Sequence, residues 1–121
     1  MRIYLDTNVI MDLLLGRDSA AYQLVIKICS EQHEVIISSL VVAELERNGL
    51  SAEGFIALLC SNTIVITCSP DEHDRMEARQ LPTHFADALH YVLACRYGAD
   101  YLVTKNIKDF PFDNIRRPDE L

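Results

Sequence analysis

The order of apolar segments along the chain restricts its fold more than any other feature. Short runs rich in β-branched and aromatic residues alternate with longer stretches whose apolar residues recur at helical spacing. Strands that alternate with helices predict a parallel sheet covered by helices on both faces. We therefore expect a three-layer α/β/α fold, Rossmann-like, with four or five parallel strands. The expected strands are 3–5, 35–37, 63–67 and 101–103, and the tail around Ile115 has room for one edge strand.

Capping residues set the boundaries of the expected helices. Thr7 or Asn8 can cap the first helix, which stops at Gly16. Ser69 and Pro70 have the order typical of a helix start, with Ser at the cap and Pro at the first helical position. The other expected helices are 20–32, 40–47, 51–61 and 82–96.

Length and composition are those of one globular domain, which we place at residues 1–121. Half of the 121 residues are hydrophobic and 24% are charged, which is enough apolar material for a core. No basic segment followed by an apolar stretch begins the sequence, and the apolar run 9–15 is too short to cross a bilayer. We expect a cytoplasmic protein that makes no use of a membrane.

Four cysteines are spread along the chain without a C-x-x-C pair. Each has apolar neighbours in the sequence, which is typical of reduced core thiols rather than of a disulfide framework or a zinc site. This pattern also favours a cytoplasmic location. The four are Cys29, Cys60, Cys68 and Cys95.

The chain has a formal charge of −7, from 18 acidic and 11 basic residues. Proteins that bind nucleic acid are more often basic, so this charge argues against a large phosphate-binding surface. Three explanations stay open: carboxylates gathered at a metal site, acidic solubility, and a basic partner.

Four acidic residues, far apart in the sequence, are expected at one edge of the sheet. In open α/β sheets, ligands bind beyond the carboxyl ends of the strands. Asp6 ends the first strand, and Glu44 lies early in the helix after the second. Asp87 lies in the first turn of the helix before the fourth strand, and Asp109 follows that strand. Clustered carboxylates repel one another unless a cation neutralises them, and oxygen ligands suit Mg²⁺ or Mn²⁺.

Each of these residues also has a simpler interpretation. Asp6 can cap a helix, Glu44 can be a solvated helix acid, and Asp87 can serve the helix dipole. Asp109 can be a turn acid, and Thr104 can either end a strand or orient a carboxylate with its hydroxyl. We favour the metal-site interpretation for the four acids, because all of them are expected at the same edge.

Other polar residues near these positions have ordinary explanations. His84 and His90 flank Asp87 by three residues on each side and are expected on the helix surface or near substrate rather than as metal ligands. Lys105 and Lys108 are expected to be solvated turn lysines, although either can meet a phosphate. Asn8 and Asn106 are expected to form turns.

The sequence resembles the PIN-domain nucleases and is similar to the toxin ribonucleases of type II toxin–antitoxin pairs. The segments that carry the resemblance are "LDTNV", "SLVVAELE", "FADALH", "LVTKNIKDF" and the late "RRPDEL". The resemblance implies Mg²⁺- or Mn²⁺-dependent cleavage of RNA to products with a 5′-phosphate and a 3′-hydroxyl. It also implies a small antitoxin partner and a homodimer. The sequence departs from the pattern at Asn106, where some members have Asp, so Asp109 is the candidate fourth acid.

Three other functions fit the sequence less well. A phosphatase with an aspartyl nucleophile at Asp6 needs a second Asp two residues on, where Asn8 stands. A response-regulator receiver needs a phosphoacceptor Asp after the third strand, where Cys68 and Ser69 stand. A PIN-like RNA-binding or assembly subunit with weakened catalysis is the main alternative, and Asn106 and the acidic charge favour it.

Overall fold

A computed structural model describes all residues from 1 to 121. Its centre is a sheet of five parallel strands in the order β3-β2-β1-β4-β5. The strands are β1 (Arg2–Leu5), β2 (Glu34–Ser38), β3 (Val65–Cys68), β4 (Tyr101–Val103) and β5 (Ile115–Arg116). The α/β class and the parallel sheet are therefore confirmed, including the edge strand in the tail.

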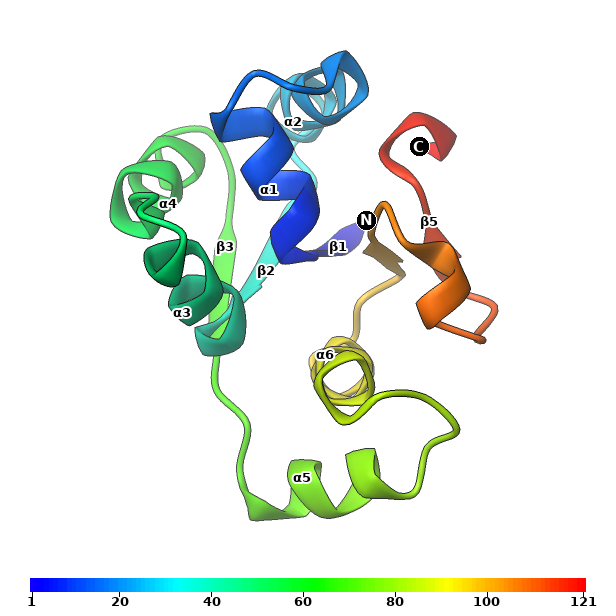
Figure 1. Ribbon diagram of the computed structural model, residues 1–121. Coiled ribbons are helices and arrows are strands. Elements are labelled where there is room, and N and C mark those ends of the chain that lie inside the picture. Colours follow the sequence, from blue (N-terminus) through cyan, green and yellow to red (C-terminus); the bar gives the residue numbers. More distant parts are fainter.

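Helices cover both faces of the sheet, so the three-layer arrangement is also confirmed. Crossovers between parallel strands are right-handed. The chain runs outward from β1 to β2 to β3, then back to β4, and the helices of the return lie on the opposite face. Figure 1 shows α1 to α4 on one side of the sheet and α5 and α6 on the other. The helices are α1 (Thr7–Leu14), α2 (Ser19–Ser30), α3 (Ser39–Arg47), α4 (Ala52–Cys60), α5 (Glu72–Arg79) and α6 (Phe85–Arg96), with short 3₁₀ turns η1 (Ile107–Asp109) and η2 (Pro118–Glu120).

The central strand β1 is buried on both faces, because helices cover each side of it. Ile3, Tyr4 and Leu5 are each at most 1% exposed. A continuous apolar run of this kind is expected for a strand in the middle of a parallel sheet. Tyr4 differs from Ile3 and Leu5 because it carries a hydroxyl group, which must find a hydrogen-bond partner in the core.

Two helices start differently from the sequence expectation. Asp6, rather than Thr7 or Asn8, caps α1, and its side chain accepts a hydrogen bond from the Thr7 backbone N–H. At α5 the cap is Asp71 rather than Ser69, because Asp71 and Asp74 form a reciprocal capping box. In both cases the carboxylate that directly precedes the first helical residue caps the helix.

The expectation that all four cysteines lie in the core is wrong for two of them. Cys68 is buried and Cys29 is half-buried, whereas Cys60 and Cys95 are exposed. Cys60 is the last residue of α4, and Cys95 lies near the end of α6, where the helix surface meets solvent. All four thiols are free.

No helix is both long enough and apolar enough to cross a membrane.

The strand order reverses between β1 and β4, which are neighbours in the sheet although they are far apart in the sequence. In doubly wound sheets a crevice opens beyond the carboxyl ends of the two strands at such a reversal. Asp6 follows β1 and Thr104 follows β4, so the fold places both at this point.

Candidate active site

The carboxylate of Asp6 is held at the reversal by two donors. Its Oδ1 accepts from the Thr7 N–H at 2.8 Å, and its Oδ2 accepts from Thr104 Oγ1 at 2.8 Å. Asp6 is 8% exposed and Thr104 is fully buried. The expected orienting role of the Thr104 hydroxyl agrees with this contact. The capping and site interpretations of Asp6 also coexist, because one carboxylate oxygen caps α1 while the other faces Thr104.

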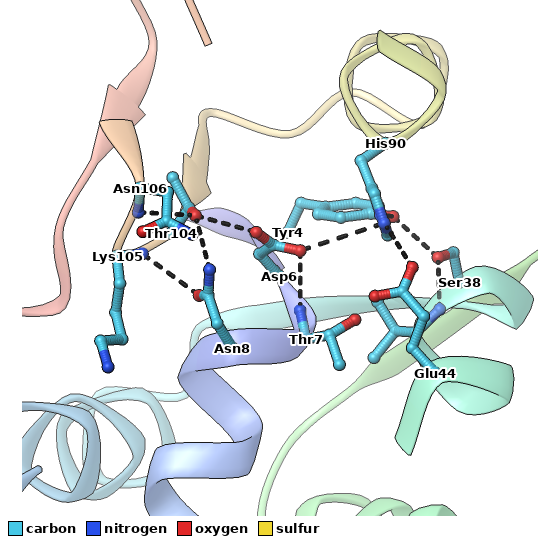
Figure 2. Close-up of polar contacts among 11 residues, drawn as sticks. Tyr4, Asp6, Thr7, Asn8, Ser38, Glu44, His90, Thr104, Lys105 and Asn106 are labelled. Atoms are coloured by element: carbon cyan, nitrogen blue, oxygen red, sulfur yellow. Dashed lines mark hydrogen bonds and ion pairs between the residues drawn. The ribbon is translucent and has the colours of Figure 1, made fainter. Parts of the chain in front are cut away.

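The loop after β4 is tied to α1 by further hydrogen bonds, shown in Figure 2. Asn8 Nδ2 donates to Thr104 Oγ1 at 3.3 Å, and Asn8 Oδ1 accepts from the Lys105 N–H at 3.2 Å. The Asn106 N–H also donates to Thr104 Oγ1. Asn8 therefore links two segments of the site, a role beyond the turn former expected from the sequence.

Glu44 reaches the same region from α3 and is paired with a buried histidine. His90 Nε2 lies 3.0 Å from Glu44 Oε1 and 4.0 Å from Asp6 Oδ1. The other ring nitrogen, Nδ1, lies 2.6 Å from the Tyr4 hydroxyl. His90 is 3% exposed. The prediction of a surface histidine at this position is therefore wrong, whereas its place beside the acidic residues fits a location near substrate.

A pocket of about 420 Å³ opens over these side chains. Asp6, Glu44 and Asp87, from three different elements, all line it. The sequence expectation that these acids share one edge of the sheet is met in the structure. The remaining lining residues are Thr7, Asn8, Met11, Arg47, Asn48, Ala86, His90 and Asn106.

The last motif contributes Asn106 to the pocket, whereas Asp109 does not line it. Asp109 is exposed in η1, and its backbone carbonyl accepts from Thr83 Oγ1 at 2.6 Å. Its carboxylate is still near enough to act on Asp87: burial raises the pKa of Asp87, and the charges of Asp109 and Asp6 raise that pKa further. Asp109 thus lies at the periphery of the acidic group.

The pKa values of Glu44 and His90 shift in opposite directions from their usual values. Burial is the largest single influence on Glu44 and raises its pKa, but the hydrogen bond from His90, a contribution from Thr7 and the charges of His90 and Arg47 together leave the Glu44 pKa below its usual value. Burial is the largest single influence on His90 and lowers its pKa, but the hydrogen bond to Glu44 and the charges of Asp6, Glu44 and Asp87 together raise the His90 pKa above its usual value. Each partner therefore stabilises the charged form of the other.

The carboxylate oxygens that line the pocket are the type of ligand that a hard divalent cation prefers. Burial and the negative charges of Asp109 and Asp6 outweigh the charges of His90 and His84 at Asp87, and a bound cation would relieve that repulsion. No three His, Cys, Asp or Glu side chains converge closely enough to form a ready-made metal centre. Mg²⁺ commonly takes only one or two carboxylates directly and keeps several waters. Asp6, Glu44 and Asp87 are the residues that would hold it.

The sequence left the place of His90 open between the helix surface and the neighbourhood of the substrate, and it did not identify Arg47. The spacing of His90 to the buried Leu93 and Ala94 places it on the inner face of α6. Arg47 lines the pocket at the end of α3 and is its only cationic side chain apart from His90. No sequence pattern singles out Arg47, because basic residues are ordinary at the last turn of a helix.

A buried ion pair supports the rim of the site. Asp12 on α1 is 1% exposed, and Lys105 Nζ lies 2.6 Å from its Oδ2. Arg17 Nη2 lies 3.1 Å from Asp12 Oδ1. The expectation that Lys105 is a solvated turn lysine is therefore only half right, because its ammonium is paired with a buried carboxylate on α1.

An acidic pocket at the reversal of a parallel sheet defines an α/β protein that binds its ligand at the topological switch point. The model of the PIN domain family matches residues 3–117. The chain belongs to the PIN domain family, a family of nucleases. No curated protein sequence matches the chain.

Solved structures show the same fold at low sequence identity. A chain in the crystal structure of VapBC2 from Rickettsia felis, bound to a DNA fragment from their promoter, superposes with a TM-score of 0.66 at 19% identity. That match covers 97% of this chain and 98% of the other. A chain in a toxin–antitoxin complex from Klebsiella pneumoniae gives a TM-score of 0.66 at 20% identity and covers 96% of this chain and 97% of the other. Both comparisons support the fold.

Proposed function

We propose that this protein is a divalent-metal-dependent endoribonuclease that hydrolyses RNA phosphodiester bonds, and that it is the toxin of a toxin–antitoxin pair. The observation that carries the proposal is the meeting of Asp6, Glu44 and Asp87, from three separate elements, in one pocket. Membership of a nuclease family is consistent with that chemistry. Mg²⁺ or Mn²⁺ in this pocket would supply an activated water and stabilise the charge of the phosphoryl transition state.

The side chains of the pocket have distinct tasks in this mechanism. The carboxylates of Asp6, Glu44 and Asp87 would hold the cation, and Thr104, which donates to Asp6 Oδ2, fixes the direction of the Asp6 carboxylate. Arg47, at the end of α3, faces the pocket and is placed to pair with a phosphate of the substrate. Asp109 acts from outside the pocket through its charge on Asp87, and Asn106 takes the place on the pocket wall.

Cleavage of a mixed RNA pool tests the proposal. We expect cleavage with Mg²⁺ or Mn²⁺ and none with EDTA, and a DNA pool of the same length shows whether the substrate is RNA. Glu44→Gln and Asp87→Asn should abolish cleavage while the circular dichroism spectrum stays unchanged. Glu46→Gln, an exposed acid two residues further along α3, is the matched control and should cleave as the wild type does. Full activity of both pocket variants would falsify the assignment.

A catalytically weakened RNA-binding or assembly subunit is the second candidate. The observation that favours it is the position of Asn106 on the pocket wall with Asp109 outside. Calorimetric titration with Mn²⁺ separates the two functions: no heat of Mn²⁺ binding, together with RNA binding but no cleavage, selects the subunit.

We place an antitoxin in an apolar groove on the face of the molecule that carries α1, α2 and α4. The groove has a volume of about 650 Å³, and Tyr22, Ile26 and Leu58 on its walls are 59%, 49% and 56% exposed. One of the structural neighbours is a toxin–antitoxin complex, and the charge of −7 suits a basic partner.

Co-purification with the product of an adjacent small gene tests this partner. Tyr22→Glu and Leu58→Glu should remove the complex, whereas Met76→Glu on α5, equally exposed and remote from the groove, should keep it. Light scattering of the purified chain tests the homodimer that the family resemblance implies.

A further inference from the structure

A chain of buried hydrogen bonds connects the helix cap of α3 with the carboxylate of Glu44 on the same helix. The Val41 N–H donates to Ser38 Oγ at 3.4 Å, and Ser38 Oγ lies 2.7 Å from the Tyr4 hydroxyl. The Tyr4 hydroxyl contacts His90 Nδ1, and His90 Nε2 contacts Glu44. Figure 2 shows the side chains from Ser38 to Glu44 in this order.

The direction of each hydrogen bond follows from the two ends of the chain. The backbone N–H of Val41 can only donate, so Ser38 Oγ accepts there and its own proton is free for Tyr4. A Glu44 carboxylate can only accept, so His90 Nε2 carries a proton. The simplest arrangement has Ser38 donating to Tyr4, Tyr4 donating to Nδ1, and Nε2–H donating to Glu44. Every polar hydrogen of the chain then has a partner.

The burial of this chain indicates that it holds one geometry. Tyr4 and Ser38 are fully buried and His90 nearly so, and they belong to β1, β2 and α6. Tyr4 lies two residues before Asp6, and His90 lies three residues after Asp87. The hydrogen-bonded chain thus links α3, which carries Glu44, to α6, which carries Asp87, and to β1, whose end Asp6 follows. A buried polar side chain has no other hydrogen-bond partner to turn to when each of its present partners is itself fixed, so it keeps one orientation.

We propose that Tyr4 and His90 are positioning residues that fix the direction of the Glu44 carboxylate, so that the acidic pocket can bind a divalent cation and cleave its substrate. The inference rests on the proposed function for its catalytic consequence, and not for its structural part. Groups that orient the ligands of a metal contribute about 10–100-fold to affinity or activity. Tyr4, which acts through His90, should contribute about tenfold.

Tyr4→Phe is the most direct variant, because it removes one oxygen atom and keeps the ring. Tyr97→Phe, a half-buried tyrosine at the opposite end of α6, is the matched control. In metal-free protein, ¹⁵N NMR of the imidazole should show Nε2–H and unprotonated Nδ1 in neutral His90. In Tyr4→Phe this tautomer preference should weaken, while Tyr97→Phe should leave it unchanged.

Mn²⁺ titration and cleavage kinetics give the second readout. Tyr4→Phe should weaken Mn²⁺ binding and lower kcat, each about tenfold, with KM for RNA nearly unchanged. Should Tyr4→Phe fail to fold, two His90 variants replace it. His90→Gln keeps a donor near Glu44, whereas His90→Leu removes both contacts, so the Gln variant should retain more Mn²⁺ affinity than the Leu variant.

The outcomes separate this inference from the proposed function. Unchanged or tighter Mn²⁺ binding in folded Tyr4→Phe overturns the inference, even when the wild type cleaves RNA. Equal loss in His90→Gln and His90→Leu also overturns it, because a retained donor would then have no effect. A wild type that cleaves no RNA, but whose Mn²⁺ affinity and tautomer respond to Tyr4→Phe, overturns the proposed function and supports the positioning role.

Discussion

Thr104 and Asp6 are 98 positions apart in the sequence, and the Thr104 hydroxyl donates to Asp6 Oδ2 at 2.8 Å. The contact exists because β1 and β4 pair in parallel and both end at this edge. It gives the second carboxylate oxygen of Asp6 a fixed donor, after Thr7 has occupied the first. A helix cap and a candidate metal ligand are thereby combined in one side chain.

Thr104→Val should therefore weaken both the fold and the activity. The substitution keeps the volume of the side chain but leaves Asp6 Oδ2, Asn8 Nδ2 and the Asn106 N–H without this partner. We expect urea titration to show a free energy of unfolding that is lower than that of the wild type by about 1–3 kcal/mol. Cleavage should fall at least about tenfold. Thr104→Ser retains the hydroxyl and should stay near the wild type, and equal effects of Val and Ser would contradict the role of the hydrogen bond.

The ion pair of Asp12 with Lys105 should contribute to stability, because the carboxylate is buried. Removing one partner of a fully buried pair leaves an uncompensated charge and costs about 3–5 kcal/mol. Arg17 and the solvent exposure of Lys105 reduce this loss, so we expect about 1–2 kcal/mol for Lys105→Met in urea titration. Lys108→Met, an exposed lysine in the same loop with no ion pair, is the control and should have no measurable effect.

Asp12→Leu in the Lys105→Met background should recover part of the lost stability. The double substitution removes the buried charge along with its partner, and apolar replacements of buried pairs are often neutral. Thermal unfolding of the two single variants and the double variant measures the coupling. Strictly additive losses would show that the two side chains do not interact.

Divalent cations should stabilise the protein against heat. Asp87→Asn should be more stable than the wild type without metal and less stable than the wild type with metal. Without metal, the Asp87 charge is disfavoured by burial and by Asp109 and Asp6, so the Asn variant should melt at a higher temperature than the wild type. With Mn²⁺ at about 100 times its Kd, the wild type should gain about 2.7 kcal/mol. The Asn variant should gain much less. Differential scanning calorimetry with Mn²⁺ and with EDTA provides both comparisons, and an equal gain in the two proteins would contradict the placement of the cation.

Cysteine reactivity should depend on pH and on position. Burial raises the pKa of the Cys68 thiol to about 11, from about 8.5 for a free thiol. A pKa that is raised in the folded state favours folding below the unfolded pKa, and this contribution is lost as the pH rises from about 8.5 toward 11. At pH 8, iodoacetamide should alkylate the exposed Cys60 and Cys95, while Cys68 reacts after urea unfolding. Peptide mass spectrometry locates the label, and early modification of Cys68 would contradict its protected state.

The sequence by itself determined the order of strands and helices, because apolar spacing is a local property that survives in any α/β arrangement. It also placed Asp6, Glu44 and Asp87 at one edge, since the ends of parallel strands and the starts of the returning helices meet there. Helix caps were less certain, because two or three neighbouring polar residues can satisfy the same N–H groups. Asp6 and Asp71 were selected by backbone geometry, which the sequence does not contain.

Only the tertiary structure decided the partners of the buried polar groups. His90 is an ordinary helix residue in the sequence, and it becomes the link between Tyr4 and Glu44 because α6 packs against β2 and β4, the two strands that flank β1. Asn106 rather than Asp109 lines the pocket, because the 3₁₀ turn after Asn106 carries Asp109 to the surface. Hydrogen bonds and ion pairs require atoms within about 3 Å, and distances at that scale arise from packing between segments that are remote in the chain.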